Sequence, residues 1–134
     1  MTSLTPSTIP VRTVGLRGEA KMTVADRDTA RALHSGTVDV LGTPRLIALC
    51  EEASCLAVDR HLAAGATTVG IRVRIDHVQP TPVGAGVTAE AALRRIEGRR
   101  LTFEVSAFDD RGLVAAGKVT RVLVDEERFM SRCR

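Results

Sequence analysis

The apolar residues of this chain change their spacing near residue 65, and that change limits the folds it can adopt. Between Thr43 and Gly65, apolar residues recur every three or four positions, which is the spacing of one face of a helix. From Thr67 onward they recur every second position, as in strands that bury one face. A chain of 134 residues fits one domain. The pattern therefore predicts a single domain in which one long helix precedes several strands.

The predicted helix begins at Thr43 and Pro44, since Thr is a favoured N-cap and Pro suits the first helical turn. Gly65 is expected to end it. One apolar stripe and a second, largely apolar line run along the helix, which predicts burial over most of its circumference. The stripe contains Leu46, Leu49, Cys50, Ala53 and Ala57, and the second line contains Ile47, Glu51, Ser54 and Val58.

Five strands and one short helix are expected around this long helix. A strand over 18–24 comes first, then a short helix over 28–33 capped by Asp26. The strand that begins at Thr67 is expected to bury Val69, Ile71, Val73 and Ile75, and Pro80 to Gly84 end it. Strands follow over 87–93, 101–107 and 113–124, before a short polar tail.

Short turns join the last four strands, which favours antiparallel pairing. A largely buried helix needs cover on many sides, and one curled sheet supplies it. The expected fold class is therefore α+β, a hot-dog fold in which a curled antiparallel sheet wraps round one central helix. This domain is expected over residues 14–134, after a flexible N-terminal arm of residues 1–13 rich in Thr, Ser and Pro. The open edges of such a sheet favour pairing with a second copy, as in a homodimer.

Composition argues against several classes of protein. The only aromatic residues are three Phe, too few to stack bases, and the basic residues form no helical stripe, so we expect no nucleic-acid partner. No apolar run approaches the length of a membrane span, and the N-terminus does not resemble a signal peptide, so no membrane partner is expected. Three cysteines without a C-x-x-C pair indicate a reduced, cytoplasmic chain with no metal site.

Three residues suggest chemistry at one end of the predicted helix. Glu51 lies on a helix expected to be buried, where a carboxylate is costly without a partner. His77 continues the buried face of the strand that begins at Thr67, so an inward imidazole and Glu51 would each reduce the desolvation cost of the other. Thr43 stands at the helix N-terminus, where free N–H groups favour negative charge. Each residue also has a simpler interpretation: Glu51 as a carboxylate at a dimer seam, His77 as a structural histidine, and Thr43 as a plain N-cap. Together, however, a hydroxyl, a carboxylate and an imidazole are the groups that acyl transfer requires.

The stretch from His77 to Gly84 reads His-Val-Gln-Pro-Thr-Pro-Val-Gly. It is similar to the His-x-x-Pro-Thr-Pro-x-Gly run of the fluoroacetyl-CoA thioesterase family of hot-dog proteins. Residues 94–101, Arg-Arg-Ile-Glu-Gly-Arg-Arg-Leu, are similar to a second run of that family. The resemblance extends from about Val24 to Phe129. The family's catalytic Thr, Glu and His match Thr43, Glu51 and His77, separated here by eight and twenty-six positions.

The resemblance also implies a substrate-binding Gly seven residues before the His, matched by Gly70, and an Arg on the last strand, matched by Arg121. It implies no cofactor, because CoA is part of the substrate. The fluoroacetate-specific enzyme carries Phe residues before the Thr as a lid over the fluoromethyl group. The corresponding stretch here, His34 to Thr37, contains none. The resemblance therefore implies thioester chemistry, and the missing lid leaves the identity of the acyl group open.

The sequence thus predicts a homodimeric acyl-CoA thioesterase that uses Thr43, Glu51 and His77. His77 would serve as general acid–base, Glu51 as nucleophile or as base for water, and Thr43 would assist at the carbonyl oxygen. The arginines between Arg94 and Arg100 are a candidate for holding nucleotide phosphates, with a solvated basic face as the simpler interpretation. The alternative function is a non-catalytic module that binds acyl-CoA or a small lipid on the same fold.

Overall fold

The computed structural model describes residues 13–134. The expected arm of residues 1–13 lies outside the described residues apart from Thr13. The elements follow in the order β1 (Arg17–Thr23), η2 (Asp26–Asp28), α1 (Thr43–Val58), η3 (Asp59–His61), β2 (Ala66–His77), β3 (Gly86–Glu97), β4 (Arg100–Asp109), β5 (Gly112–Asp125) and α2 (Glu126–Ser131), where η marks a 3-10 helix.

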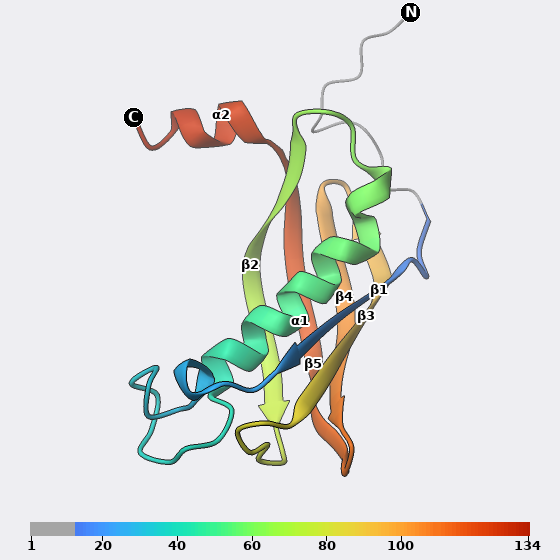
Figure 1. The fold of residues 1–134 in the computed structure, drawn as a ribbon. Helices are drawn as coiled ribbons and strands as arrows, with labels where there is room; N and C mark the ends of the chain where they lie inside the picture. Colours follow the sequence, from blue (N-terminus) through green and yellow to red (C-terminus); the bar gives the residue numbers. More distant parts are fainter. Residues whose placement is uncertain (1–12) are drawn as a thin grey trace, which may run out of the picture.

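The strands form one antiparallel sheet in the order β1-β3-β4-β5-β2. Figure 1 shows α1 lying across one face of this sheet, with β1 beside it and α2 projecting from the end of β5. The core lies between α1 and the sheet and consists almost entirely of aliphatic side chains, with Phe103 as its largest member. The predicted α+β architecture, one long helix held in a curled antiparallel sheet, is confirmed.

The helix α1 buries the predicted apolar stripe but differs at both ends from the expectation. Gly42, not Thr43, is the N-cap, and Thr43 occupies the first helical turn with Pro44. The helix ends at Val58 and continues as the 3-10 turn η3, so it stops well before Gly65. Because Thr43 is not the cap, its hydroxyl is available for another partner.

One local prediction outside α1 was wrong. The helix expected over 28–33 is only the 3-10 turn η2, because the backbone of Thr29 is already extended where the turn ends. Thr29 then bridges to Leu41 instead of continuing a helix. The polar tail after β5 folds as the short helix α2.

The strand β2 contains a bulge that reverses part of its predicted pattern. The pairing with β5 shifts between Gly70 and Arg72, which leaves Ile71 as the extra residue. Before the bulge, Thr68 is buried, whereas Ile71 is 49% exposed. Val69 and Ile71 therefore do not share the buried face with the residues after the bulge, and Gly70 faces α1 in their place.

The helix α1 lies unusually close to β1. A Cβ atom added to Gly18 would overlap the backbone oxygen of Ala53 and the backbone nitrogen of Ala57. Glycine at position 18 and alanine on the facing turn of α1 therefore allow helix and strand to pack backbone against backbone.

We predict that Gly18→Ala lowers the free energy of unfolding by about 1–3 kcal/mol, since α1 or β1 must move to admit the methyl group. Urea denaturation measures this loss. Gly86→Ala is the matched control on β3, because the nearest atom to a Cβ there is the backbone oxygen of Met22 at 3.9 Å. Equal stability losses in the two variants would contradict the close packing.

Candidate active site

Thr43 and His77 form a pair at the N-terminal end of α1. The Thr43 Oγ1 lies 2.8 Å from the His77 Nδ1, which joins the first turn of the helix to the last residue of β2. The other ring nitrogen of His77, Nε2, is buried and has no hydrogen-bond partner among residues 13–134. Burial lowers the pKa of the His77 imidazole, and the nearby backbone of Gln79 opposes this shift in part. The imidazole is therefore held mainly in its neutral, basic form near pH 7.

A groove of about 310 Å³ opens beside this pair. Apart from Thr43 and His77, its lining is mainly aliphatic. Ser35, from the stretch that corresponds to the Phe lid implied for the fluoroacetate-specific enzyme, also lines the groove, and the described lining residues include no Phe, Tyr or Trp. The remaining lining residues are Ala30, Val38, Val40, Leu41, Val78, Gln79 and Pro80.

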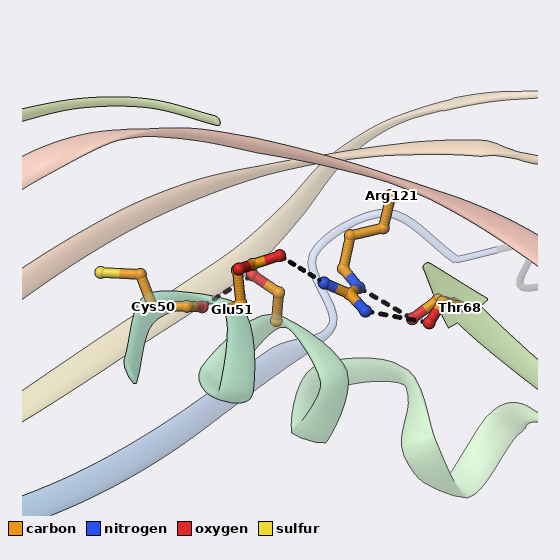
Figure 2. A network of polar contacts seen from close by, with 5 residues as sticks. Cys50, Glu51, Thr68 and Arg121 are labelled. Atoms are coloured by element: carbon orange, nitrogen blue, oxygen red, sulfur yellow. Dashed lines mark hydrogen bonds and ion pairs between the residues drawn. The ribbon is translucent and has the colours of Figure 1, made fainter. Parts of the chain in front are cut away.

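Glu51, further along α1, pairs with Arg121 on β5. The Arg121 Nη1 donates to the Glu51 Oε2 at 2.9 Å, while its Nε and Nη2 donate to the hydroxyl and the backbone oxygen of Thr68, each at 2.9 Å. The Arg121 side chain is 9% exposed and the Glu51 side chain 32%. Figure 2 shows the guanidinium held between α1 and β2. The carboxylate is thus fixed through one oxygen and remains partly accessible.

Gly70 stands directly against this ion pair. A Cβ atom there would overlap the Glu51 Oε2 and would lie 3.1 Å from the Arg121 Nη1. Any side chain at position 70 would therefore displace the carboxylate. The two positions that the resemblance assigned to substrate binding, Gly70 and Arg121, thus lie beside Glu51.

The structure separates the three predicted catalytic residues into two clusters. His77 contacts Thr43, and Glu51 contacts Arg121, so the expected mutual compensation between Glu51 and His77 is not found. Thr43 and Glu51 are eight residues apart, about 12 Å along the helix axis. Among the described residues, His77 is thus paired through Nδ1 with Thr43 and Glu51 with Arg121.

Sequence reasoning missed Thr68, whose hydroxyl and carbonyl hold the guanidinium. The sequence of β2 contains two alternating patterns, and they predict opposite inner faces. Thr68 and Gly70 alternate on one face of β2, yet the more apolar Val69 and Ile71 made the opposite face the expected inner one. An apolar pattern alone cannot reveal the bulge that reconciles the two.

Other candidate groups do not lie in either cluster. Burial raises the pKa of the Cys50 thiol to about 11, with the charge of Glu51 adding to the effect, so Cys50 is a poor nucleophile. Its sulfur points away from the carboxylate (Figure 2). His34 and His61 are exposed. Among residues 13–134, no three His, Cys, Asp or Glu side chains gather as a metal site.

The arginines between positions 94 and 100 divide into two groups. Arg94 pairs with Glu104 at 3.3 Å and Arg95 with Glu97 at 3.2 Å, whereas the structure gives Arg99 and Arg100 no carboxylate partner among the described residues. A hollow of about 420 Å³ adjoins Arg94 on the sheet. It is walled by charged side chains and includes none of the residues of the two clusters.

Comparison with known proteins places this geometry in a family. Residues 24–127 match the family described as fluoroacetyl-CoA-specific thioesterase. The fluoroacetyl-CoA thioesterase of Streptantibioticus cattleyicolor is 33% identical over 96 residues, which cover 72% of this chain and 69% of the relative. No helix among residues 13–134 is long and apolar enough to cross a membrane.

Two solved structures support the same assignment. A structure of the fluoroacetyl-CoA thioesterase is 30% identical and has a TM-score of 0.87, covering 93% of this chain and 97% of the other. A hot-dog-like protein from Thermanaerovibrio acidaminovorans is 25% identical with a TM-score of 0.81, covering 90% and 89%. The predicted hot-dog fold is thereby confirmed. The chain belongs to the fluoroacetyl-CoA-specific thioesterase family and is a thioesterase.

Proposed function

We propose that this protein hydrolyses an acyl-CoA thioester to the free acid and CoA, using Thr43, Glu51 and His77 within the domain of residues 14–134. The observation that carries the proposal is the Thr43–His77 pair beside an open groove, with the imidazole Nε2 buried and unpartnered among the described residues. A buried ring nitrogen without a partner is costly unless a reacting group engages it.

The proposed chemistry follows from the protonation states of the groups. Glu51, held through Oε2 by Arg121, either attacks the thioester carbonyl or removes a proton from an attacking water. The carbonyl π electrons move to oxygen, where Thr43 and the first N–H groups of α1 stabilise the negative charge. When the carbonyl re-forms, the C–S bond breaks and CoA leaves as a thiolate. His77, neutral at the start, takes up the proton released by the attacking water and passes it to this thiolate. Hydrolysis of any acyl–Glu51 intermediate by water completes the cycle.

The acyl group is proposed to be aliphatic and unfluorinated. The groove beside His77 has no aromatic side chain among its described lining residues, and Ser35 occupies the stretch in which the family resemblance implies a Phe lid.

The three free cysteines support the expected reducing, cytoplasmic environment.

We predict that Glu51→Ala and His77→Ala each lower kcat on a short aliphatic acyl-CoA by about 10²- to 10⁴-fold, because each removes a proton-transfer or nucleophilic group. Release of free thiol measures the rate. Glu52→Ala and His61→Ala are matched controls, since both residues are exposed and outside the two clusters. Wild-type protein that binds acyl-CoA, seen as a shift in melting temperature, but never turns it over would favour the binding module.

We predict that kcat/KM falls on the acidic side with a midpoint below about 6.5, the ordinary pKa of histidine. The pKa of His77 is lowered, so its neutral form persists to lower pH and is lost only as pH falls through the folded-state value. A pH profile with one saturating and several limiting substrate concentrations gives this midpoint. His61→Ala should leave the profile in place, and a midpoint above 6.5 would contradict the role of His77.

We also propose that the active form is a homodimer joined along β2. This strand forms one edge of the described sheet, and Ile71 at its bulge is 49% exposed. The unpaired backbone groups of an exposed edge strand invite pairing with another strand. If two copies of β2 pair antiparallel, the end of one that carries His77 lies near the half of the other that carries Gly70. Such pairing would bring the Thr43–His77 pair of one copy towards the Glu51 cluster of the second.

We predict that Ile71→Lys converts the protein to a monomer and lowers kcat at least tenfold, because a buried lysine would disrupt pairing along β2. Sedimentation equilibrium measures the mass and thiol release the rate. Val14→Lys is the matched control, since Val14 is 55% exposed and precedes β1, the strand at the opposite edge of the sheet. A wild-type protein that is an active monomer would refute the proposed assembly.

A further inference from the structure

Three arginines gather at the end of the sheet where β5 leads into α2. Arg99 lies in the turn between β3 and β4, Arg128 lies on α2, and Arg132 follows α2. They line a hollow of about 90 Å³ together with Val124, Asp125 and Phe129. This hollow belongs to neither polar cluster of the candidate active site.

Backbone hydrogen bonds hold the segments that carry these arginines. The N–H of Leu123 donates to the oxygen of Arg99 at 2.8 Å, which ties the β3–β4 turn to β5. The N–H of Glu126 donates to the oxygen of Gly65 at 2.9 Å, which ties the start of α2 to the start of β2. The Arg132 guanidinium also lies 6.0 Å from the centre of the Phe129 ring. The arginines are therefore brought together by the fold and not only by long flexible side chains.

The positive charge of this hollow is not neutralised within the chain. Among residues 13–134, none of Arg99, Arg128 and Arg132 forms an ion pair, and the sequence of residues 1–12 contains no Asp or Glu. Asp125 is the one carboxylate among the lining residues, against three guanidinium groups. By contrast, Arg94 and Arg95 nearby are each paired with a glutamate. An anion in the hollow would relieve the repulsion among the three arginines.

Phosphate is the anion that this arrangement suits. A guanidinium presents a planar fork of N–H groups that donates to two phosphate oxygens at once, and arginine is weakly hydrated compared with lysine. Arg121, beside Glu51, and Asp125, in the hollow, are four residues apart on the same strand, about 13 Å along β5. An extended phosphopantetheine arm is longer than that. One substrate can therefore present its thioester near Glu51 and a phosphate at the arginines.

We propose that Arg99, Arg128 and Arg132 form an anchoring site for a phosphate of the nucleotide part of the CoA thioester. This inference rests on the proposed function. It divides the arginines that the sequence grouped together, since Arg99 belongs to the site while the ion-paired Arg94 and Arg95 do not. Anchoring affects binding of the distant nucleotide and not the chemical step, so it acts on KM more than on kcat.

The test compares three thioesters of the same acyl group: the CoA ester, the 3′-dephospho-CoA ester and the N-acetylcysteamine ester, which has no phosphate. In Arg99→Ala, Arg128→Ala and Arg132→Ala, KM for the CoA ester should rise roughly tenfold, as expected for a lost hydrogen bond to a charged group. The preference for the CoA ester over the N-acetylcysteamine ester should fall by the same factor. Arg94→Ala and Arg95→Ala are the matched controls, and thermal denaturation checks that all variants are folded.

The dephospho ester identifies which phosphate is held. If removal of the 3′-phosphate raises KM of wild type by the same factor, and the variants have equal KM for the two CoA esters, the site holds that phosphate. If all three arginine variants still distinguish them, the site holds the pyrophosphate. Equal KM changes in the site variants and in the controls would overturn the proposal.

The phosphate site can also be tested if the protein proves to have no thioesterase activity. If wild type hydrolyses none of the three esters, titration calorimetry with CoA itself decides about the site. Binding weakened by Arg128→Ala but not by Arg95→Ala would support a phosphate site in a non-catalytic module. Equal CoA binding by wild type and Arg128→Ala would overturn the inference.

Discussion

The packing of α1 against one curled sheet positions both polar clusters. Gly18 brings β1 against the backbone of Ala53 and Ala57, so this turn of the helix has one place on the sheet. Because a helix advances a constant 1.5 Å per residue, that contact also determines where the rest of α1 lies. Its first turn reaches the end of β2, and its middle lies opposite the bulge in β2 and the neighbouring part of β5. The site thus depends on a contact between backbones that contains no polar side chain.

The ion pair beneath α1 is better explained by function than by stability. Removing a guanidinium and a carboxylate from water costs several kcal/mol, and an apolar pair of similar volume is often at least as stable. Arg121 donates hydrogen bonds to Glu51 and to two oxygens of Thr68, and these bonds fix the orientation of the guanidinium. Only Glu51 remains partly exposed, so the arrangement presents one carboxylate at a defined position. A lysine, with its freely rotating ammonium group, would not orient the carboxylate in this way.

The parts of the fold that local patterns specify were predictable from sequence. The apolar stripe of α1 and the alternation over 87–93 and 101–107 are strong because those elements bury one continuous face. The pattern failed at β2, since one extra residue, Ile71, exchanges the two faces of a strand without changing its composition. Thr43 was expected as the N-cap because Thr before Pro is typical of that position. Its contact with His77 spans 34 residues, so only the folded chain shows it.

The lining of the groove beside His77 limits how the enzyme can select its substrate. In the proposed acyl site, aliphatic side chains such as Val38 and Val78 would recognise an acyl group by its volume alone. An apolar pocket of this kind distinguishes substrates that differ by one methylene by only about 1–3 kcal/mol. A small acyl group also contributes little binding energy of its own. Efficient turnover then requires binding energy from the part of the substrate that does not react, used to hold the thioester against the catalytic groups. In a CoA ester that part carries the phosphates. The proposed acyl groove at one end of the sheet and the proposed phosphate site at the other, with no ion pair to its arginines among the described residues, would then be complementary parts of one binding mode.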